Sequence, residues 1–404
     1  MRSADSSLKS FPLGLVTIGA AILGAIITRA LRIDPHLNPD SFAFEAIARS
    51  LLAGHGFVYR EPMLAGLDLY AFRAPAYPVP VALALAAGGM GTLITIQGAL
   101  NGVIAALVGS IAGQFGGPRA AWVAFVIRLA WPAAWFYSAL LMSEIFYEAL
   151  TVIATWLVLR SIERHRPSWI VFAGLATTAA MLTRPVGLGL AAALTCWLLI
   201  HWRRAAIGFV LVVLLAWAPW PIRNAQRLHA FVPFTTLGGA TAYTGAMEQE
   251  VGVAFQFMSS HVGMGELGLD RYFYAQARTR MRADPRATLA RAARFAMVYV
   301  GPIRGRAREL WVHRFAMLAA LPALVFAGWR RRLTLPALIW VAQGALLLPV
   351  LLLERYRYPT EWCVVVAAGL GLASLAERIG PRRAAIAGGI ALAACIAGTL
   401  AVAR

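Results

Sequence analysis

Long apolar runs recur along the whole chain, and they limit its possible folds more than any other feature. Of the 404 residues 60% are hydrophobic and 14% charged, and the mean hydropathy is +0.68; soluble domains have about 45–50% apolar and about 25% charged residues. Because the runs are continuous rather than alternating, they favour membrane-spanning helices over membrane-spanning strands. The runs lie at about 11–28, 78–95, 94–113, 120–140, 145–160, 168–183, 186–200, 205–221, 313–328, 333–353, 360–376 and 383–402. The sequence therefore predicts an all-α, polytopic integral membrane protein.

Arginine clusters predict how this protein is oriented. The formal charge of +19, from 37 basic and 18 acidic residues, would suggest a nucleic-acid partner in a soluble protein, but in a membrane protein basic residues mark cytoplasmic loops and contact anionic lipids. We therefore expect membrane lipids and no nucleic acid as partners. The clusters occupy every second connection between the runs, which makes those connections and the N-terminus cytoplasmic and the others external. They are Arg160/Arg164/Arg166, Arg203/Arg204, Arg330 to Arg332 and Arg378/Arg382/Arg383.

This orientation predicts about 11 transmembrane helices, within a range of about 10–13, and an external C-terminus. It requires that residues 75–90 form a helix at the external interface and that 94–113 form the second span. The expected divisions are an N-terminal anchor (1–31), a first external loop with surface helices (32–93), a central bundle (94–221), a long external loop (222–312) and a C-terminal bundle (313–404).

Amphipathic segments are expected in both long external loops. Residues 41–53 have apolar side chains at helical spacing, and Glu45 and Arg49 stand four apart as an expected ion pair. In the second loop, 270–282 and 285–299 mix arginines with aromatic and aliphatic residues. We expect these two helices to lie on the membrane surface or to cover a cavity rather than to cross the membrane.

Two carboxylates lie where the chain meets the external face. Asp40 follows the first span and precedes the surface helix, and Glu144 lies between two apolar runs. Each carboxylate could simply cap a helix, because an acidic residue at a helix start satisfies free N–H groups and opposes the helix dipole. A carboxylate at membrane depth is nevertheless costly unless it is paired or functional. Glu148, one turn deeper, is the weaker alternative to Glu144.

Four arginines fall on the external side, where positive charge is not favoured: Arg184, Arg223, Arg355 and Arg357. Each could extend its charged end to the interface, yet their coincidence predicts an anionic ligand at headgroup depth. A sugar on a polyprenyl phosphate has its reactive C1 next to that phosphate. Arginine can neutralise the departing phosphate while a carboxylate takes a proton from the acceptor. Arg128, inside a span, is expected to pair with a carbonyl or a nearby glutamate.

Other kinds of site find no support in the sequence. The cysteines Cys196, Cys363 and Cys395 lie inside apolar runs without paired or metal-ligand spacing. His55 is a lone histidine, and the seven histidines show no HExxH spacing. Neither a Walker pattern nor a GxGxxG follows a predicted strand, which argues against ATP-driven transport and nucleotide-sugar chemistry.

The order of these features resembles the GT-C class of membrane glycosyltransferases, and within it the family 39 group, which includes protein O-mannosyltransferases and lipid A aminoarabinose transferases. The resemblance rests on an acid after the first span and a second acid about a hundred residues later, here Asp40 and Glu144. The other matching segments are AIARSLLAGHGF at 46–57, RAPAYP at 73–78, TRP at 183–185, WPIRN at 220–224 and RYRYP at 355–359.

This resemblance implies roles for individual residues. Asp40 would be the principal catalytic acid residue with Glu144 as its partner, and Arg184, Arg223, Arg355 and Arg357 would contact the donor phosphate. Secondary candidates are Glu45, His55 and Tyr77. Many relatives carry two adjacent acids in the first loop and could bind a divalent metal there, but Ser41 follows Asp40, so the sequence does not support a metal or another cofactor.

The expected function is transfer of a hexosyl or pentosyl group from a polyprenyl-phosphate donor to a lipid, glycan or protein acceptor, with inversion at C1. The expected location is the bacterial inner membrane, with the active site on the periplasmic face. Two alternatives remain at this stage: a lipid-linked sugar flippase or other transporter, and a non-catalytic scaffold of the cell envelope. A transporter would carry charges through the midplane and broken helices in matching halves.

Overall fold

The computed structural model describes residues 11–64, 66–248, 251–301, 307–326, 331–348 and 354–402. Throughout these ranges the chain is almost entirely helical, with one antiparallel pair of short strands, β1 (Tyr59–Glu61) and β2 (Leu67–Leu69). The helices are α1 Leu13–Ala30, α2 Asp40–Leu52, α3 Pro78–Gly88, α4 Met90–Leu129, α5 Pro132–Ser138, α6 Glu144–Arg164, α7 Pro167–Met181, α8 Gly187–His201, α9 Arg203–Trp217, α10 Pro219–Leu228, α11 Gly238–Met247, α12 Val251–Ser260, α13 Gly265–Ala283, α14 Pro285–Val300, α15 Ala307–Val325, α17 Thr334–Leu347, α18 Glu354–Arg357, α19 Trp362–Ile379 and α20 Pro381–Val402. Single 3-10 turns are η1 Pro62–Leu64, η2 Val262–Met264, η3 Arg331–Leu333 and η4 Tyr358–Thr360.

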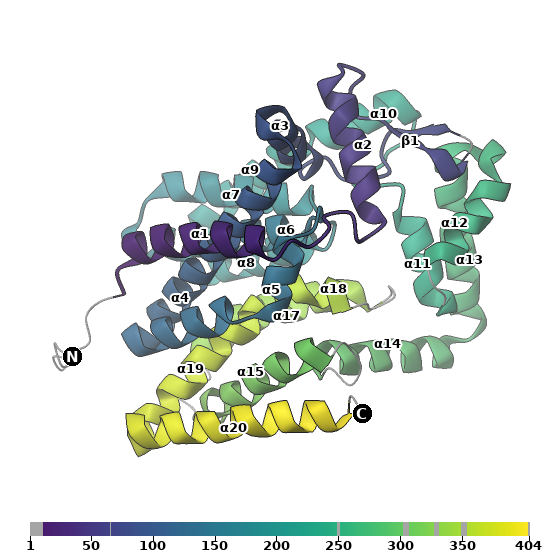
Figure 1. Ribbon diagram of the computed structural model, residues 1–404. Coiled ribbons are helices and arrows are strands. Elements are labelled where there is room, and N and C mark those ends of the chain that lie inside the picture. Colours follow the sequence, from purple (N-terminus) through teal and green to yellow (C-terminus); the bar gives the residue numbers. More distant parts are fainter. Residues whose placement is uncertain are drawn as a thin grey trace.

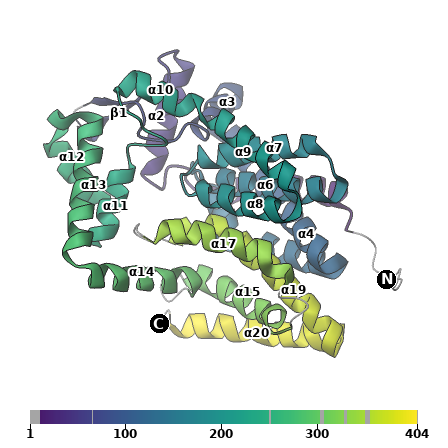
Figure 2. The same cartoon turned by 180° about the vertical axis from the view of Figure 1, so that it is seen from behind.

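The helices form a bundle with a cap at one end. In Figure 1 the long helices run across the picture, and α2, the β1–β2 hairpin and α10 to α13 stand at their right-hand end; Figure 2 shows the same division from behind. Five of the described helices are long and apolar enough to span a membrane: Leu13–Ala30, Met90–Leu129, Glu144–Arg164, Arg203–Leu228 and Trp362–Ile379. Shorter apolar helices accompany them at Pro78–Gly88, Pro167–Met181, Gly187–His201, Trp311–Val325 and Thr334–Leu347. The predicted all-α, multi-pass membrane architecture is confirmed; the five long and five shorter helices of the described residues make ten, the lower end of the predicted range of 10–13.

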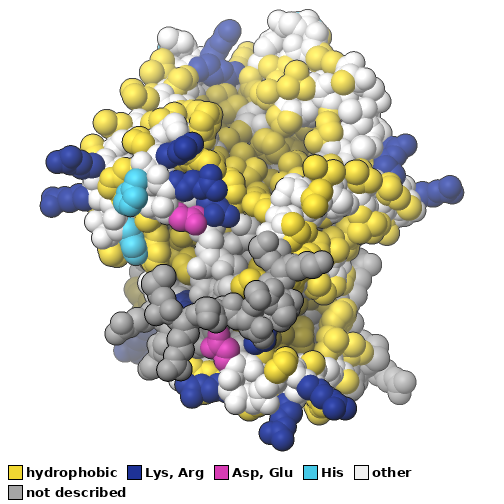
Figure 3. Space-filling model, turned by 90° about the vertical axis from the view of Figure 1, so that its left-hand side faces the viewer, with side chains coloured by type: hydrophobic (Ala, Val, Ile, Leu, Met, Phe, Trp, Pro, Cys, Tyr) yellow, Lys and Arg dark blue, Asp and Glu magenta, His cyan; other side chains and the backbone are white. Residues whose placement is uncertain are grey.

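The end opposite the cap is rich in arginine. Figure 3 shows this end, with Lys and Arg side chains around an apolar surface and few acidic ones. The helix α6 links the two ends, since Glu144 begins it at the cap and Arg164 ends it 21 residues later, a rise of about 30 Å. Glu144 and the arginine cluster at 160–166 are therefore separated by the thickness of the bundle.

The helix α4 covers the predicted run at 94–113 and the first part of the run at 120–140, and its break falls between the two runs. It contains a break at Gly117, whose φ of 77° lies in the left-handed region, and Pro118 follows. The second half then ends at Leu129, and Trp131 is extended before α5 begins at Pro132. The prediction of one continuous span at 120–140 was wrong, because hydropathy does not register a Trp-Pro step that interrupts a helix. The separate helix expected at 75–90 is present as α3.

A polar network inside the bundle accounts for Arg128. Its side chain is only 2% exposed and donates to both carboxylate oxygens of Glu148 at 2.9 and 2.8 Å and to Asn101 Oδ1 at 2.9 Å. The hydroxyl of Tyr358 also donates to Glu148, at 2.6 Å. A buried charge is tolerated when it is paired and hydrogen-bonded in this way. The network therefore ties α4 and α6 to the segment that follows α18.

Candidate active site

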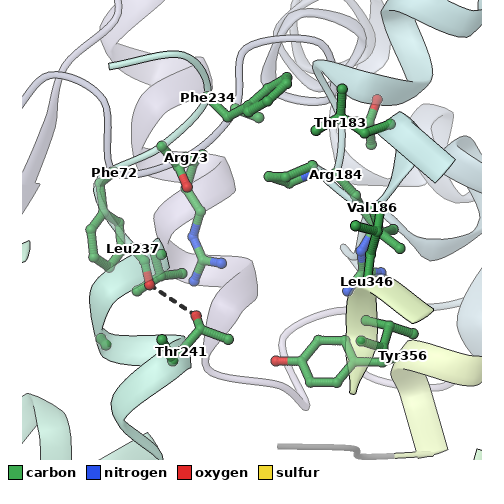
Figure 4. A pocket seen from close by; sticks show the side chains of 18 of the residues that line it. Phe72, Arg73, Thr183, Arg184, Val186, Phe234, Leu237, Thr241, Leu346 and Tyr356 are labelled. Atoms are coloured by element: carbon green, nitrogen blue, oxygen red, sulfur yellow. Dashed lines mark hydrogen bonds between the residues drawn. The ribbon is translucent and has the colours of Figure 1, made fainter. Parts of the chain in front are cut away.

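A cavity of about 990 Å³ lies between the bundle and the cap. One wall comes from the segment after β2, with Phe72 and Arg73, and from the loop and helix at 234–241. The facing wall comes from the loop after α7, with Arg184, and from α18, with Tyr356. Figure 4 shows the Arg73 guanidinium and the Tyr356 ring projecting toward the space between the walls. Asp40, Glu144 and Arg355 also line this cavity.

Asp40 is the first residue of α2, but it does not cap that helix through its side chain. Asn38 performs a similar task, because its Oδ1 accepts from the Asp40 backbone N–H at 3.0 Å. The Asp40 carboxylate instead accepts from Arg73 Nη2 at 2.6 Å and lies 2.8 Å from Arg355 Nη2. Burial would raise the pKa of Asp40, but these two guanidiniums outweigh burial and hold the pKa well below its usual range. The carboxylate is thus ionised and paired.

Glu144 is the first residue of α6, and its side chain is 1% exposed. Its Oε1 lies 2.9 Å from Arg184 Nη1, yet neither carboxylate oxygen has a hydrogen-bond partner among the described residues. The guanidinium and the carboxylate are close enough for an ion pair, but the N–H group does not point at the carboxylate oxygen. A hydrogen bond needs direction as well as distance. Oε1 is thus ion-paired with Arg184, whereas Oε2 has no partner among the described residues and can accept from a ligand.

Three guanidiniums gather around these carboxylates: Arg73, Arg184 and Arg355. The planes of Arg184 and Arg355 lie near the Tyr356 ring, at 5.6 and 5.1 Å from its centroid. Buried donors without a described partner remain at Arg73 Nε and Arg355 Nε, whereas Arg184 Nη1 lies against Glu144 Oε1. The whole cavity lining carries five arginines and three acidic residues, and its formal charge of +2 suits a phosphodiester or another anion.

Arg73 was absent from the arginines selected on the sequence. A signal was available, because Arg73 opens the RAPAYP segment that contributes to the family resemblance. The distribution of arginines between the two sides of the membrane did not single out Arg73, since Arg73 stands in a long polar loop rather than at the end of an apolar run.

The structure does not bring Arg223 or Arg357 to the cavity wall. Arg223 donates to the backbone carbonyl oxygens of Tyr70 and, at 2.6 Å, Phe57. Arg357 is buried and donates to Glu361 at 2.8 Å and to the Val298 carbonyl at 3.1 Å. Both guanidiniums are occupied by protein acceptors, so their placement fits a structural role and not the predicted contact with a donor phosphate.

The secondary candidates also lie away from the cavity lining. Glu45 forms the expected ion pair with Arg49 at 2.5 Å and a further contact with His36 at 2.5 Å. His55 is exposed in the turn after α2. Tyr77 is buried and donates to Gln97 Oε1 at 2.7 Å. Across the described ranges, no group of three or more His, Cys, Asp or Glu side chains is placed to hold a metal ion.

The cap side of the cavity is formed by one stripe of α13. The stripe recurs at helical spacing and consists of Asp270, Tyr274, Ala277, Arg278, Met281 and Arg282. Its first residue, Asp270, accepts from the Gly239 backbone N–H at 2.7 Å, and burial raises the pKa of Asp270 to about 6. The expectation that the helix at 270–282 covers a cavity is met in this arrangement.

The helix α14 occupies the segment expected at 285–299, and its expected place on the membrane surface or over a cavity stays a prediction. It leaves the cap and runs in the direction of α15 along the bundle (Figure 1). Near its end Tyr299 is buried, and its hydroxyl donates to the Trp340 carbonyl at 3.0 Å. Amphipathicity alone does not distinguish a helix that lies on lipid from one that packs against other helices.

A buried carboxylate holds the segment that carries Arg73. Glu266 accepts from the backbone N–H groups of Tyr70 at 2.6 Å and Ala71 at 2.8 Å, and from the Thr236 hydroxyl at 2.6 Å. The Thr236 N–H in turn donates to the Ala71 carbonyl at 2.9 Å. These bonds join the segment after β2 to α13 and so determine where Arg73 points.

No protein-family model and no curated protein matches the sequence. Solved structures do match the fold. The oligosaccharyltransferase of Archaeoglobus fulgidus, in complex with zinc and sulfate, superposes with a TM-score of 0.60 at 13% identity over 94% of this chain and 52% of that one. The same archaeal enzyme, AglB, in complex with an inhibitory peptide and a dolichol-phosphate gives a TM-score of 0.59 at 14% identity over 96% of this chain and 54% of that one.

A weaker similarity exists to ArnT from Cupriavidus metallidurans bound to undecaprenyl phosphate, with a TM-score of 0.44 at 15% identity over 90% of this chain and 77% of that one. This score is too low to establish a shared fold. The chain spans about half the length of the oligosaccharyltransferase it matches. The protein therefore has the GT-C fold, and identities of 13–14% establish the fold alone.

Proposed function

We propose that this protein is an integral-membrane glycosyltransferase that moves one sugar from a polyprenyl-phosphate donor to a lipid, glycan or protein acceptor. One observation carries the proposal: Asp40 and Glu144 share a cavity with Arg73, Arg184 and Arg355, and the buried Nε atoms of Arg73 and Arg355 have no described partner. The GT-C fold supports it, because a matching enzyme was solved with a dolichol-phosphate. Membership of family 39 stays a prediction from the order of the sequence motifs.

The residues divide the chemistry between them. Arg73, Arg184 and Arg355 hold the donor phosphate and stabilise the charge that develops on it. The acceptor oxygen or nitrogen attacks C1, the bond from C1 to the phosphate oxygen breaks, and its electron pair leaves with the phosphate. The acceptor proton passes to the Asp40 carboxylate, which acts as general base. Glu144, whose Oε1 is paired with Arg184, accepts a hydrogen bond from the sugar through Oε2. Attack opposite the departing phosphate inverts C1.

The cavity is proposed to face the outside of the cell, which in a Gram-negative bacterium is the periplasm. Support comes from its position at the cap end, with the arginine clusters at the far end of helices such as α6. The membrane is then the inner membrane, and the acceptor reaches the cavity from the cap side.

Replacement of Asp40 by asparagine tests the proposal. The measured quantity is release of polyprenyl phosphate from polyprenyl-phosphate sugars in membranes that contain the full chain. Loss of a well-placed base costs about 10²–10⁴ in rate, so Asp40→Asn is expected to abolish most transfer. Glu45→Gln, on the same helix but outside the cavity, is the matched control and is expected to retain transfer. If Asp40→Asn stays within about threefold of the wild-type rate, Asp40 is not the base.

A second experiment identifies the natural acceptor and separates an enzyme from a scaffold. Envelope glycans and lipids from a strain without the protein are compared with the wild type by mass spectrometry. A missing sugar that returns with the wild-type gene but not with Asp40→Asn supports transfer. Its return with both genes would show that the Asp40 carboxylate is not required, and the base would then have to be another group.

A further inference from the structure

Asp40 and a donor phosphate compete for the same guanidiniums. We propose that donor binding releases the base: the phosphate draws Arg73 and Arg355 out of their ion pairs with Asp40, so that this carboxylate accepts a proton only after the donor is bound. This inference rests on the proposed function and adds a fixed order to it, with the donor before the acceptor.

Both oxygens of Asp40 are already engaged. Oδ1 accepts from Arg73 at 2.6 Å and Oδ2 lies 2.8 Å from Arg355. The side chains are 23% exposed for Asp40, 13% for Arg73 and 18% for Arg355, so solvent screens these pairs only in part. A carboxylate stabilised by two guanidiniums has little tendency to take a proton from a hydroxyl group. In this arrangement Asp40 is a poor base.

The two arginines are built to bind a second anion. Each presents a fork of N–H donors, and the Nε of both is buried without a described partner. Arg355 has further contacts that do not involve Asp40, with Asn38 Oδ1 at 3.4 Å and the Tyr356 hydroxyl at 3.3 Å. Arg73 lies over the rings of Phe44 and Phe72, at 5.2 and 5.1 Å. These contacts keep both guanidiniums in the cavity while their terminal nitrogens turn from carboxylate to phosphate.

Phosphate binding then raises the proton affinity of the Asp40 carboxylate in two ways. It removes positive partners from the carboxylate, and it places a negative charge nearby; both favour the protonated form. The neighbouring pair of Glu144 and Arg184 lies in the same cavity and carries no net formal charge. The donor therefore supplies the basicity that its own transfer requires.

Competition between Asp40 and the donor phosphate predicts in which direction a replacement of Asp40 changes the affinity for phosphate. If Asp40 holds the guanidiniums that bind phosphate, its neutralisation makes them free for the ligand. Asp40→Asn is expected to bind undecaprenyl phosphate about fivefold more tightly than the wild type, as expected for loss of a competing, half-buried ion pair. A residue that merely contacted the donor, or merely stabilised the fold, would weaken binding when replaced.

The experiment measures the Kd of the purified full chain for undecaprenyl phosphate in detergent by intrinsic tryptophan fluorescence. Glu45→Gln is the control variant and undecaprenol, which lacks the phosphate, is the control ligand; neither is expected to show the increase in affinity. If Asp40→Asn does not fold, Asp40→Ser replaces it, because serine suits the start of a helix equally well.

Three outcomes are informative. Tighter binding by the Asp40 variant, seen with the phosphate and not with undecaprenol, supports release of the base. Unchanged or weaker binding by the variant, with clear binding by the wild type, overturns the release and leaves the proposed function intact. Absence of binding by the wild type contradicts the proposed function and the release together.

Discussion

Arg128 offers a direct test of how the bundle tolerates charge. The change is Arg128→Met, which keeps a long apolar stem and removes the guanidinium. Glu148, 1% exposed, would lose two hydrogen bonds of 2.9 and 2.8 Å and its opposite charge. Because an uncompensated buried charge remains, the expected loss is about 3–5 kcal/mol in the free energy of unfolding. Asn101 Oδ1 would also lose its donor at 2.9 Å.

The assay is unfolding of the purified protein in mixed micelles by titration with sodium dodecyl sulfate. The double variant Arg128→Met/Glu148→Gln removes both charges and is expected to recover most of the loss, since a buried ion pair often contributes little net stability. Arg119→Met, an exposed position on the same helix, is the control and is expected to cost less than about 0.5 kcal/mol. A double variant as unstable as the sum of its two single variants would refute the reasoning, because additivity means that the charges are not coupled.

Three further predictions concern the cap and the orientation. Glu266→Ala leaves three hydrogen-bond donors without their acceptor. At about 1 kcal/mol per bond it is expected to lower the free energy of unfolding by about 3 kcal/mol, measured by the same titration with sodium dodecyl sulfate. A loss below about 1 kcal/mol would mean that the Glu266 carboxylate does not hold the segment at Tyr70 and Ala71. Burial raises the pKa of Asp270 from 3.8 to about 6 in the folded protein, so the stability contributed by the protonated carboxyl group is fully present below about pH 4 and is lost as pH rises through 6. Asp270→Asn is therefore expected to raise the melting temperature at pH 7.5 but not at pH 4. An equal rise at both pH values would contradict the raised pKa of Asp270. Cysteines placed at Arg164 and Arg184 are expected to react with a membrane-impermeant reagent from opposite sides, and labelling from one side would invalidate the orientation.

Much of the architecture could be predicted because lipid imposes strict rules on the chain. An apolar run in a bilayer must satisfy its own backbone hydrogen bonds, so it forms a helix. Hydropathy therefore located the helical segments, and the break at Gly117 falls between the predicted runs at 94–113 and 120–140. The step at Trp131 was missed because it depends on local backbone conformation, to which an average over many residues is insensitive.

Part of the site could be predicted for a similar reason. The orientation rule assigns residues to one side of the membrane, and Asp40, Glu144, Arg184 and Arg355 do meet in one cavity. The rule says nothing about the direction of a side chain. Arg223 lies near the same end of the bundle, yet its guanidinium turns to backbone carbonyl groups.

Arg73 could not be recognised by this reasoning because its position depends on contacts between distant parts of the chain. Glu266, which holds Tyr70 and Ala71, is almost 200 residues away, with separations of 196 and 195 positions. Neither periodicity nor charge spacing reveals such a contact. Its only trace in the sequence was the motif to which Arg73 belongs.

The arginines near the cap separate into two groups by a single physical criterion. Arg223 and Arg357 donate to protein oxygens, and so does Arg128 deeper in the bundle. Arg73 and Arg355 pair with Asp40 and Arg184 pairs with Glu144, but Arg73 and Arg355 each keep a buried Nε without a described acceptor, in the cavity that also holds the unpartnered Oε2 of Glu144. Each unsatisfied buried group costs about 1–3 kcal/mol, and a protein gains nothing from collecting such costs in one cavity unless a ligand removes them. A phosphate for the guanidiniums and sugar hydroxyl groups for the carboxylate would satisfy both sets, which is why the site is interpreted as one for a sugar phosphate and not as a structural ion cluster.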